Sequence, residues 1–194
     1  MRKGILPMCG RYYIAEDDME LQEILAALGH DERIKTGEIF PTNVVPVLIA
    51  ERKPKLMQWG FARYDGKGSI INARSETVAE KPMFQRAMQE RRCLLPASWY
   101  FEWKNVEAGK KQKHAISLPG QNALYMAGIY REEKDMDLPV FVILTREASA
   151  SISSVHNRMP VILPKAIHPL WFQSSDPQNL FTLVAQDMEA RKAY

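Results

Sequence analysis

The 194-residue sequence lacks several features that define special classes of protein. Only two cysteines occur, Cys9 and Cys93, and they form no C-x-x-C pair, which excludes a disulfide-dense scaffold. The four histidines show no metal-ligand spacing, so we expect no bound metal. No run of about 18 apolar residues is present, so we expect no membrane-spanning helix. These absences together predict a protein of the reducing cytoplasm.

The remaining composition is that of an ordinary globular protein. Hydrophobic residues make up 46% of the chain and charged residues 25%, which argues against disorder. A formal charge of +3 permits a phosphate-binding face but does not imply one. The length fits one domain with a sizeable core, which we assign to residues 8–194. Residues 1–7 have a charged start but no apolar core, so we interpret them as an N-terminal extension and not as a signal peptide.

The hydrophobic pattern predicts short strands that mostly follow one another, too closely spaced for βαβ crossovers. Four helices are expected, over residues 16–28, 82–92, 148–154 and 167–173. Met19 is expected in the buried stripe of the first helix, and no role is evident for the tail after Asp176. The sequence therefore predicts a single α+β domain with a curved, largely antiparallel, barrel-like sheet and flanking helices.

Cys9 lies in the segment Met8-Cys9-Gly10-Arg11. An isolated cysteine is usually buried and inert, but glycine and arginine are poor core neighbours, and the Arg11 guanidinium would favour the thiolate. If translation began at Met8, removal of that methionine would leave Cys9 with a free α-amine beside its thiol. An amine condenses with an aldehyde to an imine, and an adjacent thiol can then close a thiazolidine ring. The alternative electrophile is a peptide carbonyl, as in an N-terminal hydrolase.

Asn72, Arg74 and Glu76 alternate at the end of an expected strand, so their side chains would project to one side. A carboxamide, a guanidinium and a carboxylate could together bind a phosphate or a sugar. In the alternative, Asn72 bonds its own backbone in a turn and Arg74 pairs with Glu76. The residues by themselves leave both interpretations open.

Three further residues could take part in chemistry or binding. Glu102 stands between Phe101 and Trp103, whose apolar surroundings would raise its pKa and suit it to proton transfer, although strand alternation also allows a solvated face. His156 could act as an acid, a base or a phosphate partner near neutral pH, although a lone histidine is more often structural. Trp59 could be a stacking platform for a DNA base or simply part of the core.

Five sequence blocks, taken together and in this order, resemble the SRAP family (SOS-response-associated peptidases). The resemblance runs from Met8 to about Pro164, nearly the whole chain. The blocks are Met8-Cys9-Gly10-Arg11, Trp59-Gly60, Asn72-Ala73-Arg74-Ser75-Glu76-Thr77, Arg92-Cys93-Leu94-Leu95-Pro96-Ala97-Ser98-Trp99-Tyr100-Phe101-Glu102-Trp103 and His156-Asn157-Arg158-Met159-Pro160.

The resemblance implies a one-domain fold of strands and flanking helices with a positively charged groove for single-stranded DNA. It also implies that Cys9, as the N-terminal residue, captures the ring-opened aldehyde of an abasic site as a thiazolidine. Asn72 and Arg74 match residues that hold the cysteine end and the lesion phosphates. Glu102 matches the acid–base group, and His156 matches a residue that assists proton transfer. Two further residues match DNA-contacting positions, Arg11 and Arg158.

The leading hypothesis is therefore a monomeric abasic-site sensor of the DNA damage (SOS) response, crosslinking itself to single-stranded DNA in the bacterial nucleoid without a cofactor. Two alternatives stay open. The first is a thiol autopeptidase that removes its own N-terminal prefix. The second is a reader of modified bases that binds DNA without covalent chemistry.

The N-terminal extension is a departure from the family pattern. Family members begin Met-Cys and lose the methionine, whereas seven residues precede Met8 here. With Met1–Pro7 attached, Cys9 has no free amine and cannot form a thiazolidine. Translation could start at Met8, the extension could be foreign to the natural protein, or the protein could remove its own prefix. We favour the first two explanations because Met1–Pro7 carries no structural signal.

Overall fold

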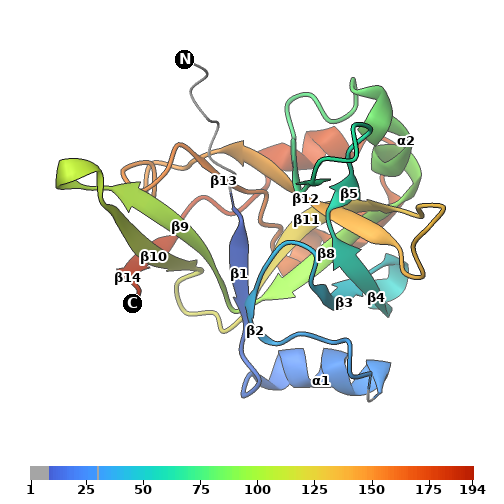
Figure 1. Ribbon diagram of the computed structural model, residues 1–194, viewed down its shortest axis with the longest axis horizontal. Helices are drawn as coiled ribbons and strands as arrows, with labels where there is room; N and C mark the ends of the chain where they lie inside the picture. The colour runs from blue at the N-terminus through green and yellow to red at the C-terminus, as the bar shows by residue number, and fades with distance from the viewer. Residues whose placement is uncertain (1–8, 30) are drawn as a thin grey trace.

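The computed structural model describes residues 9–29 and 31–194, which form two curved sheets and a small two-stranded one, with helices packed at their margins (Figure 1). The helices are α1 (Met19–Leu28), α2 (Pro82–Glu90), α3 (His168–Gln173) and the short 3₁₀ helices η1 (Ala50–Arg52), η2 (Glu107–Gly109), η3 (Lys165–Ile167) and η4 (Pro177–Thr182). The strands are β1 (Arg11–Ile14), β2 (Gly37–Ile39), β3 (Val44–Leu48), β4 (Pro54–Trp59), β5 (Phe61–Ala62), β6 (Ser69–Ile70), β7 (Asn72–Arg74), β8 (Arg92–Ala97), β9 (Trp99–Asn105), β10 (Lys111–Ser117), β11 (Leu124–Arg131), β12 (Val140–Glu147), β13 (Arg158–Pro160) and β14 (Glu189–Lys192).

The larger sheet closes on itself. Its strands run in the order β11-β8-β3-β4-β12, and β11 also pairs with β12, so these five strands form a barrel-like ring. β12 extends beyond the ring, where β7 and β13 pair with it. The pairings of β12 with β4 and β7 are parallel, and the other pairings of this sheet between named strands are antiparallel. The predicted α+β class with a largely antiparallel, barrel-like core is confirmed.

The smaller sheet has the order β14-β10-β9-β1-β2 and projects from the barrel as a long hairpin (Figure 1). Arg11 is paired with Phe101 and Tyr12 with Tyr100, so the start of β1 lies beside the middle of β9. The tail after Asp176, for which the sequence suggested no role, supplies η4 and then β14, the edge strand beside β10.

Buried hydrophobic side chains form one cluster that fills the barrel and extends under the smaller sheet. Trp59 is fully buried within it, between Tyr12 and Phe141, at ring-centroid distances of 5.3 and 6.2 Å. The next residue, Gly60, has φ of 120°, and a Cβ there would lie 2.8 Å from Ser69 Cβ. Only glycine fits this close approach of two strands.

Helix α1 ends at Leu28 as predicted but begins at Met19, three residues after the expected start. The Asp18 carboxylate accepts a hydrogen bond from Leu21 N at 3.1 Å, and Gly29 ends the helix with φ of 71°. Leu21 and Ile24 are buried, but Met19 is 79% exposed, so its predicted place in the buried stripe is wrong. Met19 is two residues from Leu21, which is about 200° around the helix and therefore on its outer face.

Residues 148–154 do not form the predicted helix. They form hydrogen-bonded turns, with Ile152 N and Ser153 N both donating to Ser149 O. The serines here bond locally, since Ser153 Oγ donates to Ala150 O and the hydroxyls of Ser149 and Ser151 are 2.9 Å apart. Such bonds compete with the helical backbone ladder.

Arg92 joins two helix ends from inside the protein. Although only 8% exposed, its guanidinium donates to backbone carbonyls alone, at distances of 2.6–2.9 Å. The acceptors belong to the last turn of α2 and to the end of α3, and they are Met88, Gln89, Trp171, Phe172 and Ser174. These are carbonyls that a helix C-terminus leaves without an internal partner, so one side chain satisfies both ends.

We predict that Arg92→Ala lowers the free energy of unfolding by about 3 kcal/mol or more, because several buried carbonyls lose their donors. Arg86→Ala is the matched control. Arg86 lies on the surface of α2 in an exposed pair with Glu90, which contributes about 0.5 kcal/mol or less. Urea unfolding followed by circular dichroism measures both, and equal losses in the two variants would show that Arg92 has no special role.

Candidate functional site

Cys9 is fully buried, and its backbone nitrogen donates a 2.7 Å hydrogen bond to Glu102 Oε1. Its φ of 40° lies in the left-handed region, which a non-glycine residue rarely adopts. Burial raises the pKa of the Cys9 thiol, and the Glu102 carboxylate raises it further. The thiol is therefore protonated at neutral pH, and the nitrogen, not the sulfur, is the atom in contact with the carboxylate.

The Arg11 guanidinium does not activate this thiol, so that expectation is wrong. Arg11 and the buried Tyr12 alternate on β1 and point to opposite faces. The guanidinium lies on the outer face, where it donates to Glu38 Oε1 at 3.0 Å.

Glu102 has the properties of a proton-transfer group. Its side chain is buried, and burial raises its pKa above the ordinary carboxyl value, while His156 and the N–H groups of Cys9 and Trp103 oppose part of that rise. The prediction that its apolar strand would desolvate it is confirmed. The alternative of a solvated face is excluded, because Glu102 points inward from β9.

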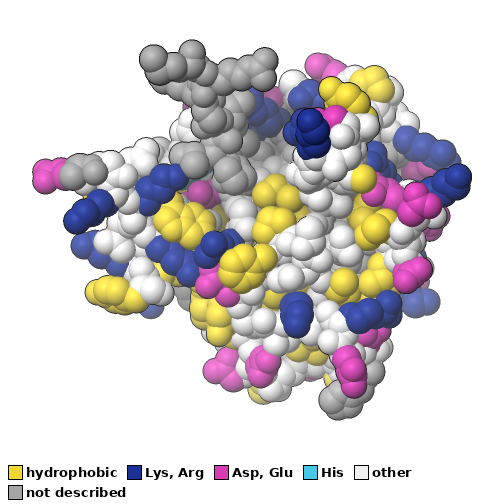
Figure 2. Space-filling view, in the orientation of Figure 1, with side chains coloured by type: hydrophobic (Ala, Val, Ile, Leu, Met, Phe, Trp, Pro, Cys, Tyr) yellow, Lys and Arg dark blue, Asp and Glu magenta, His cyan; other side chains and the backbone are white. Residues whose placement is uncertain are grey.

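A pocket of about 370 Å³ opens above this carboxylate. Its lining combines aromatic and apolar groups with charged and titratable ones. The lining residues are Gly10, Arg11, Phe40, Pro41, Ile71, Glu102, Trp103, Lys111 and His156. In Figure 2, Lys and Arg side chains gather around hydrophobic ones over the part of the molecule that holds β9 and β10.

His156 stands beside Glu102 in the pocket, with its Nδ1 4.0 Å from Glu102 Oε1. The same Nδ1 lies 3.1 Å from Arg158 N and 3.2 Å from Arg158 O, so it can accept from the first or donate to the second. The turns at 148–155 and the start of β13 hold the ring there. Two titratable groups, one carboxyl and one imidazole, thus share one pocket wall.

Arg11 forms the pocket rim together with residues that sequence reasoning missed. Its guanidinium lies 4.4 Å from the Phe40 ring and 5.2 Å from the Trp103 ring, so two aromatic rings hold it. Lys113 donates to both oxygens of Glu38 at 3.0 Å. Glu38, Phe40 and Lys113 come from β2, the segment after it, and β10, and only the pairing of the strands brings them together.

Asn72 and Arg74 start and end β7, as the alternation predicted. Asn72 is half-buried and follows Ile71, which lines the pocket. Arg74 is exposed, and no ion pair or side-chain hydrogen bond joins it to another residue in the described part of the chain. Their predicted roles at the cysteine end and the phosphates stay predictions.

Arg158 is held more tightly than the sequence suggested. Its guanidinium donates to Glu76 Oε1 at 2.5 Å and to Glu76 Oε2 at 2.8 Å, and also to Thr145 O at 2.8 Å. Its hydrogen bonds lower the pKa of the Glu76 carboxyl. The alternative interpretation, in which Arg74 pairs with Glu76, is wrong, because Arg158 bonds both oxygens of that carboxylate.

Trp59 is part of the core, so its predicted role as a stacking platform for a base is corrected. Its ring is fully buried and its Nε1 donates to Ile71 O at 3.0 Å. The tryptophan is therefore hydrogen-bonded to the backbone of Ile71, which lines the pocket. Cys93 is also fully buried, and its pKa is raised by burial.

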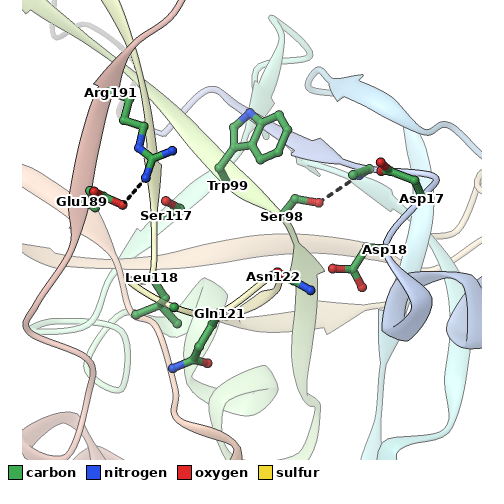
Figure 3. Close-up of a pocket in the computed structure, with 12 residues that line it drawn as sticks. Asp17, Asp18, Ser98, Trp99, Ser117, Leu118, Gln121, Asn122, Glu189 and Arg191 are labelled. Atoms are coloured by element: carbon green, nitrogen blue, oxygen red, sulfur yellow. Dashed lines mark hydrogen bonds and ion pairs between the residues drawn. The ribbon is translucent and has the colours of Figure 1, made fainter.

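A second cavity, of about 540 Å³, lies at the other end of the smaller sheet (Figure 3). Its walls carry Asp17, Ser98, Trp99, Glu189 and Arg191, and Figure 3 shows Arg191 paired with Glu189. It contains neither a cysteine nor a histidine. The smaller pocket, which is lined by Glu102 and His156 and whose Glu102 is bonded to Cys9 N, is therefore the candidate site.

Within residues 9–29 and 31–194, no group of three or more His, Cys, Asp or Glu side chains could hold a metal ion. In the same ranges, no helix is long and apolar enough to cross a membrane.

The family model described as SOS response associated peptidase (SRAP) matches residues 8–194. The chain belongs to the SRAP family. Abasic site processing protein YobE of Bacillus subtilis is 29% identical over 94% of this chain and 93% of its own length. Abasic site processing protein YedK of Escherichia coli is 30% identical over 86% of this chain and 80% of its own length.

Solved structures show the same fold at low sequence identity. A protein from Bordetella bronchiseptica superposes with a TM-score of 0.78 at 20% identity, covering 96% of this chain and all of the other. A protein from Bacteroides thetaiotaomicron gives 0.76 at 21% identity, over 96% and 92% of the two chains. The SRAP fold thus contains the pocket, with Cys9 at the second matched residue.

We predict that Glu102→Gln removes a pH-dependent loss of stability. In the wild type the folded state keeps the Glu102 proton at pH values where the unfolded chain has released it, so stability falls as pH rises above about 4.3. Gln can still accept the Cys9 N–H bond but does not ionise. Urea unfolding at a series of pH values should show the variant gaining on the wild type as pH rises. The surface variant Glu80→Gln controls for loss of charge, and an equal trend there would contradict the assignment to Glu102.

Proposed function

We propose that this SRAP protein processes abasic sites in single-stranded DNA by forming a covalent thiazolidine between Cys9 and the lesion aldehyde. The observation that carries the proposal is the 2.7 Å contact between the Cys9 nitrogen and Glu102 in a pocket that also holds His156. The names of the relatives, abasic site processing proteins, support the choice of substrate. The form that reacts begins at Cys9, because only there is this nitrogen an amine.

The chemistry balances with the groups present. The Cys9 amine adds to the aldehyde carbon, and the nitrogen gives up a proton to the Glu102 carboxylate. Glu102 passes that proton to the former aldehyde oxygen, which becomes the hydroxyl of a carbinolamine. Glu102 then takes the second N–H proton and delivers it to that hydroxyl, which leaves as water, and a neutral imine forms. Cys9 Sγ then adds to the imine carbon, and the thiol proton moves to the nitrogen. Aldehyde and aminothiol thus become a thiazolidine and one water.

The raised pKa values fix the order of these steps. The thiol of Cys9 is protonated at neutral pH and is a poor nucleophile before the imine forms. The raised pKa of the Glu102 carboxyl brings it closer to neutral pH than an ordinary carboxyl, which suits it to take and give a proton. Glu102 and His156 are also placed to open the closed hemiacetal form of the abasic sugar, since that step needs an acid and a base.

The rim of the pocket suits the strand on either side of the lesion. Arg11 and Lys111 line the pocket, and Arg74 is exposed at the end of β7. Cations at these positions would bind phosphates, which makes binding sensitive to salt. Phe40 and Trp103 present ring faces on which unstacked bases could rest. An unpaired strand is favoured because its bases are free to turn toward such rings.

The same contact favours a second candidate activity, removal of the prefix by the protein itself. In the full chain the nitrogen held by Glu102 is the leaving group of the Met8–Cys9 peptide bond. Cys9 Sγ would attack the carbonyl of that bond, Glu102 would protonate the departing nitrogen, and water would then hydrolyse the thioester. The left-handed φ of Cys9 places strain at this linkage.

We predict a denaturation-resistant adduct between the form that begins at Cys9 and an abasic single-stranded oligonucleotide, without any reductant. Cys9→Ala keeps the amine but lacks the sulfur, so its imine should survive a denaturing gel only after borohydride reduction. Cys93→Ala is the control and should give the wild-type adduct. A stable adduct of Cys9→Ala without reductant would show that no thiazolidine forms. Normal binding by Cys9→Ala, with no adduct from either protein, would favour the non-covalent reader.

We predict, for the second activity, that the intact mass of freshly made full chain falls by the mass of residues 1–8 with time. Cys9→Ala should keep its full mass, and Glu102→Gln should shorten more slowly than the wild type. Cys93→Ala should shorten at the wild-type rate. A wild-type mass that never changes would exclude self-processing but leave the capture chemistry untouched.

A further inference from the structure

Two carboxylates are paired with cations close to the pocket. Glu38 accepts hydrogen bonds from Lys113 and from Arg11, which lines the pocket. Glu76 accepts two bonds from Arg158, which lies two residues after His156, another lining residue. We propose that Glu38 and Glu76 stand in for DNA phosphates and weaken binding to undamaged strands. This inference rests on the proposed function, since it concerns how the same pocket meets DNA.

The geometry of the Arg158 pair is that of an arginine–phosphate contact. Two nitrogens of the guanidinium meet the two oxygens of Glu76 side by side, at 2.5 and 2.8 Å. Arginine binds carboxylate and phosphate in this same bidentate way. A phosphate arriving at Arg158 must therefore displace Glu76 or share its guanidinium with it.

Glu76 is not needed to keep Arg158 in place. The guanidinium has a separate anchor, since it donates to Thr145 O at 2.8 Å, and only 13% of the Arg158 side chain is exposed. Glu76, by contrast, is 47% exposed and covers the outer side of the guanidinium. If Glu76 only positioned Arg158, it would repeat what the hydrogen bond to Thr145 O already does.

The same reasoning applies to Glu38, which pairs with Arg11 and Lys113. The Phe40 and Trp103 rings hold the Arg11 guanidinium at 4.4 and 5.2 Å, and the Phe101 ring lies 4.0 Å from Lys113 Nζ. Both cations would keep their places without Glu38. Burial raises the pKa of Glu38, but the hydrogen bonds from Lys113 and Arg11 outweigh it and lower the pKa overall. Glu38 therefore stays a carboxylate and competes at neutral pH.

Displacing these carboxylates costs little, which lets DNA replace them. Partly exposed ion pairs contribute only about 0.2–1 kcal/mol each. Arg74, which has no such partner in the described ranges, would meet a phosphate directly. Arg74 can thus bind a phosphate directly, whereas the other cations are already paired with Glu38 or Glu76. Non-specific binding to DNA phosphates is therefore weak, and the covalent bond to the aldehyde determines which strand stays bound.

The test compares Glu76→Gln with the wild type for binding a fluorescein-labelled, undamaged single-stranded oligonucleotide, by anisotropy at a series of salt concentrations. We expect binding about two- to fivefold tighter at low salt. The log–log salt slope should steepen by about 0.7, the value for one more phosphate neutralised on a single strand. The form that begins at Cys9 is used, with the full chain in parallel.

Asp31→Asn is the matched control, because it removes the same charge from an exposed bidentate pair with Arg33. Asp31 follows α1, which lies at the lower edge of Figure 1, whereas β13 with Arg158 lies at the top. In Arg158→Ala, adding Glu76→Gln should give no more gain than the control, since the guanidinium that Glu76 guards is absent. Glu38→Gln should repeat the gain independently, through Arg11 and Lys113.

Weaker or unchanged binding by both Glu76→Gln and Glu38→Gln would overturn the inference and make these carboxylates positioning residues. A gain equal to that of Asp31→Asn would also overturn it, because charge alone would explain it. A wild type that neither binds single-stranded DNA nor forms the adduct would instead refute the proposed function. Adduct formation with no gain in the glutamine variants would leave the function standing and refute only the phosphate stand-ins.

Discussion

The hydrogen bond from Cys9 N to Glu102 Oε1 joins residues that are 93 positions apart in the chain. It exists because β1 pairs with β9 in one register, with Arg11 opposite Phe101 and Tyr12 opposite Tyr100. A slip of one residue would turn Glu102 to the other face of the strand. The barrel fixes this register, since the hydrophobic cluster packs against the inner face of both strands. Cys9 and Glu102 thus meet in a desolvated place where a proton can be exchanged.

Burial has opposite consequences for the groups around the pocket. Burial keeps the Cys9 thiol protonated and raises the pKa of the Glu102 carboxyl. In the proposed mechanism these two groups therefore do not react until the Cys9 amine meets an aldehyde. Outside this buried pair, Arg11 and Lys113 each have both an aromatic ring and a carboxylate beside them. The pocket therefore separates its tasks, with neutral chemistry inside and charged recognition outside.

The sequence predicted the fold class from the alternation of apolar and polar residues, and the raised pKa of Glu102 from its aromatic neighbours in the strand. It could not predict how the barrel closes or that the tail supplies β14, since those pairings join distant segments. The expected effect of Arg11 on the thiol failed for the same reason. The neighbours of Arg11, which are Glu38 and Phe40, are set by the pairing of β1 with β2. Trp59 showed a similar limit, because its burial depends on Tyr12 and Phe141.

The most direct test of the account is the carbon to which Cys9 becomes bonded. An abasic strand labelled with ¹³C at the aldehyde carbon, reacted with the form that begins at Cys9, can be followed by NMR. The account predicts that the aldehyde signal is replaced by that of a saturated carbon bonded to both nitrogen and sulfur, with ¹⁵N labelling of Cys9 splitting it. A signal from an unsaturated imine carbon, or one that ¹⁵N-labelled Cys9 leaves unsplit, would contradict it.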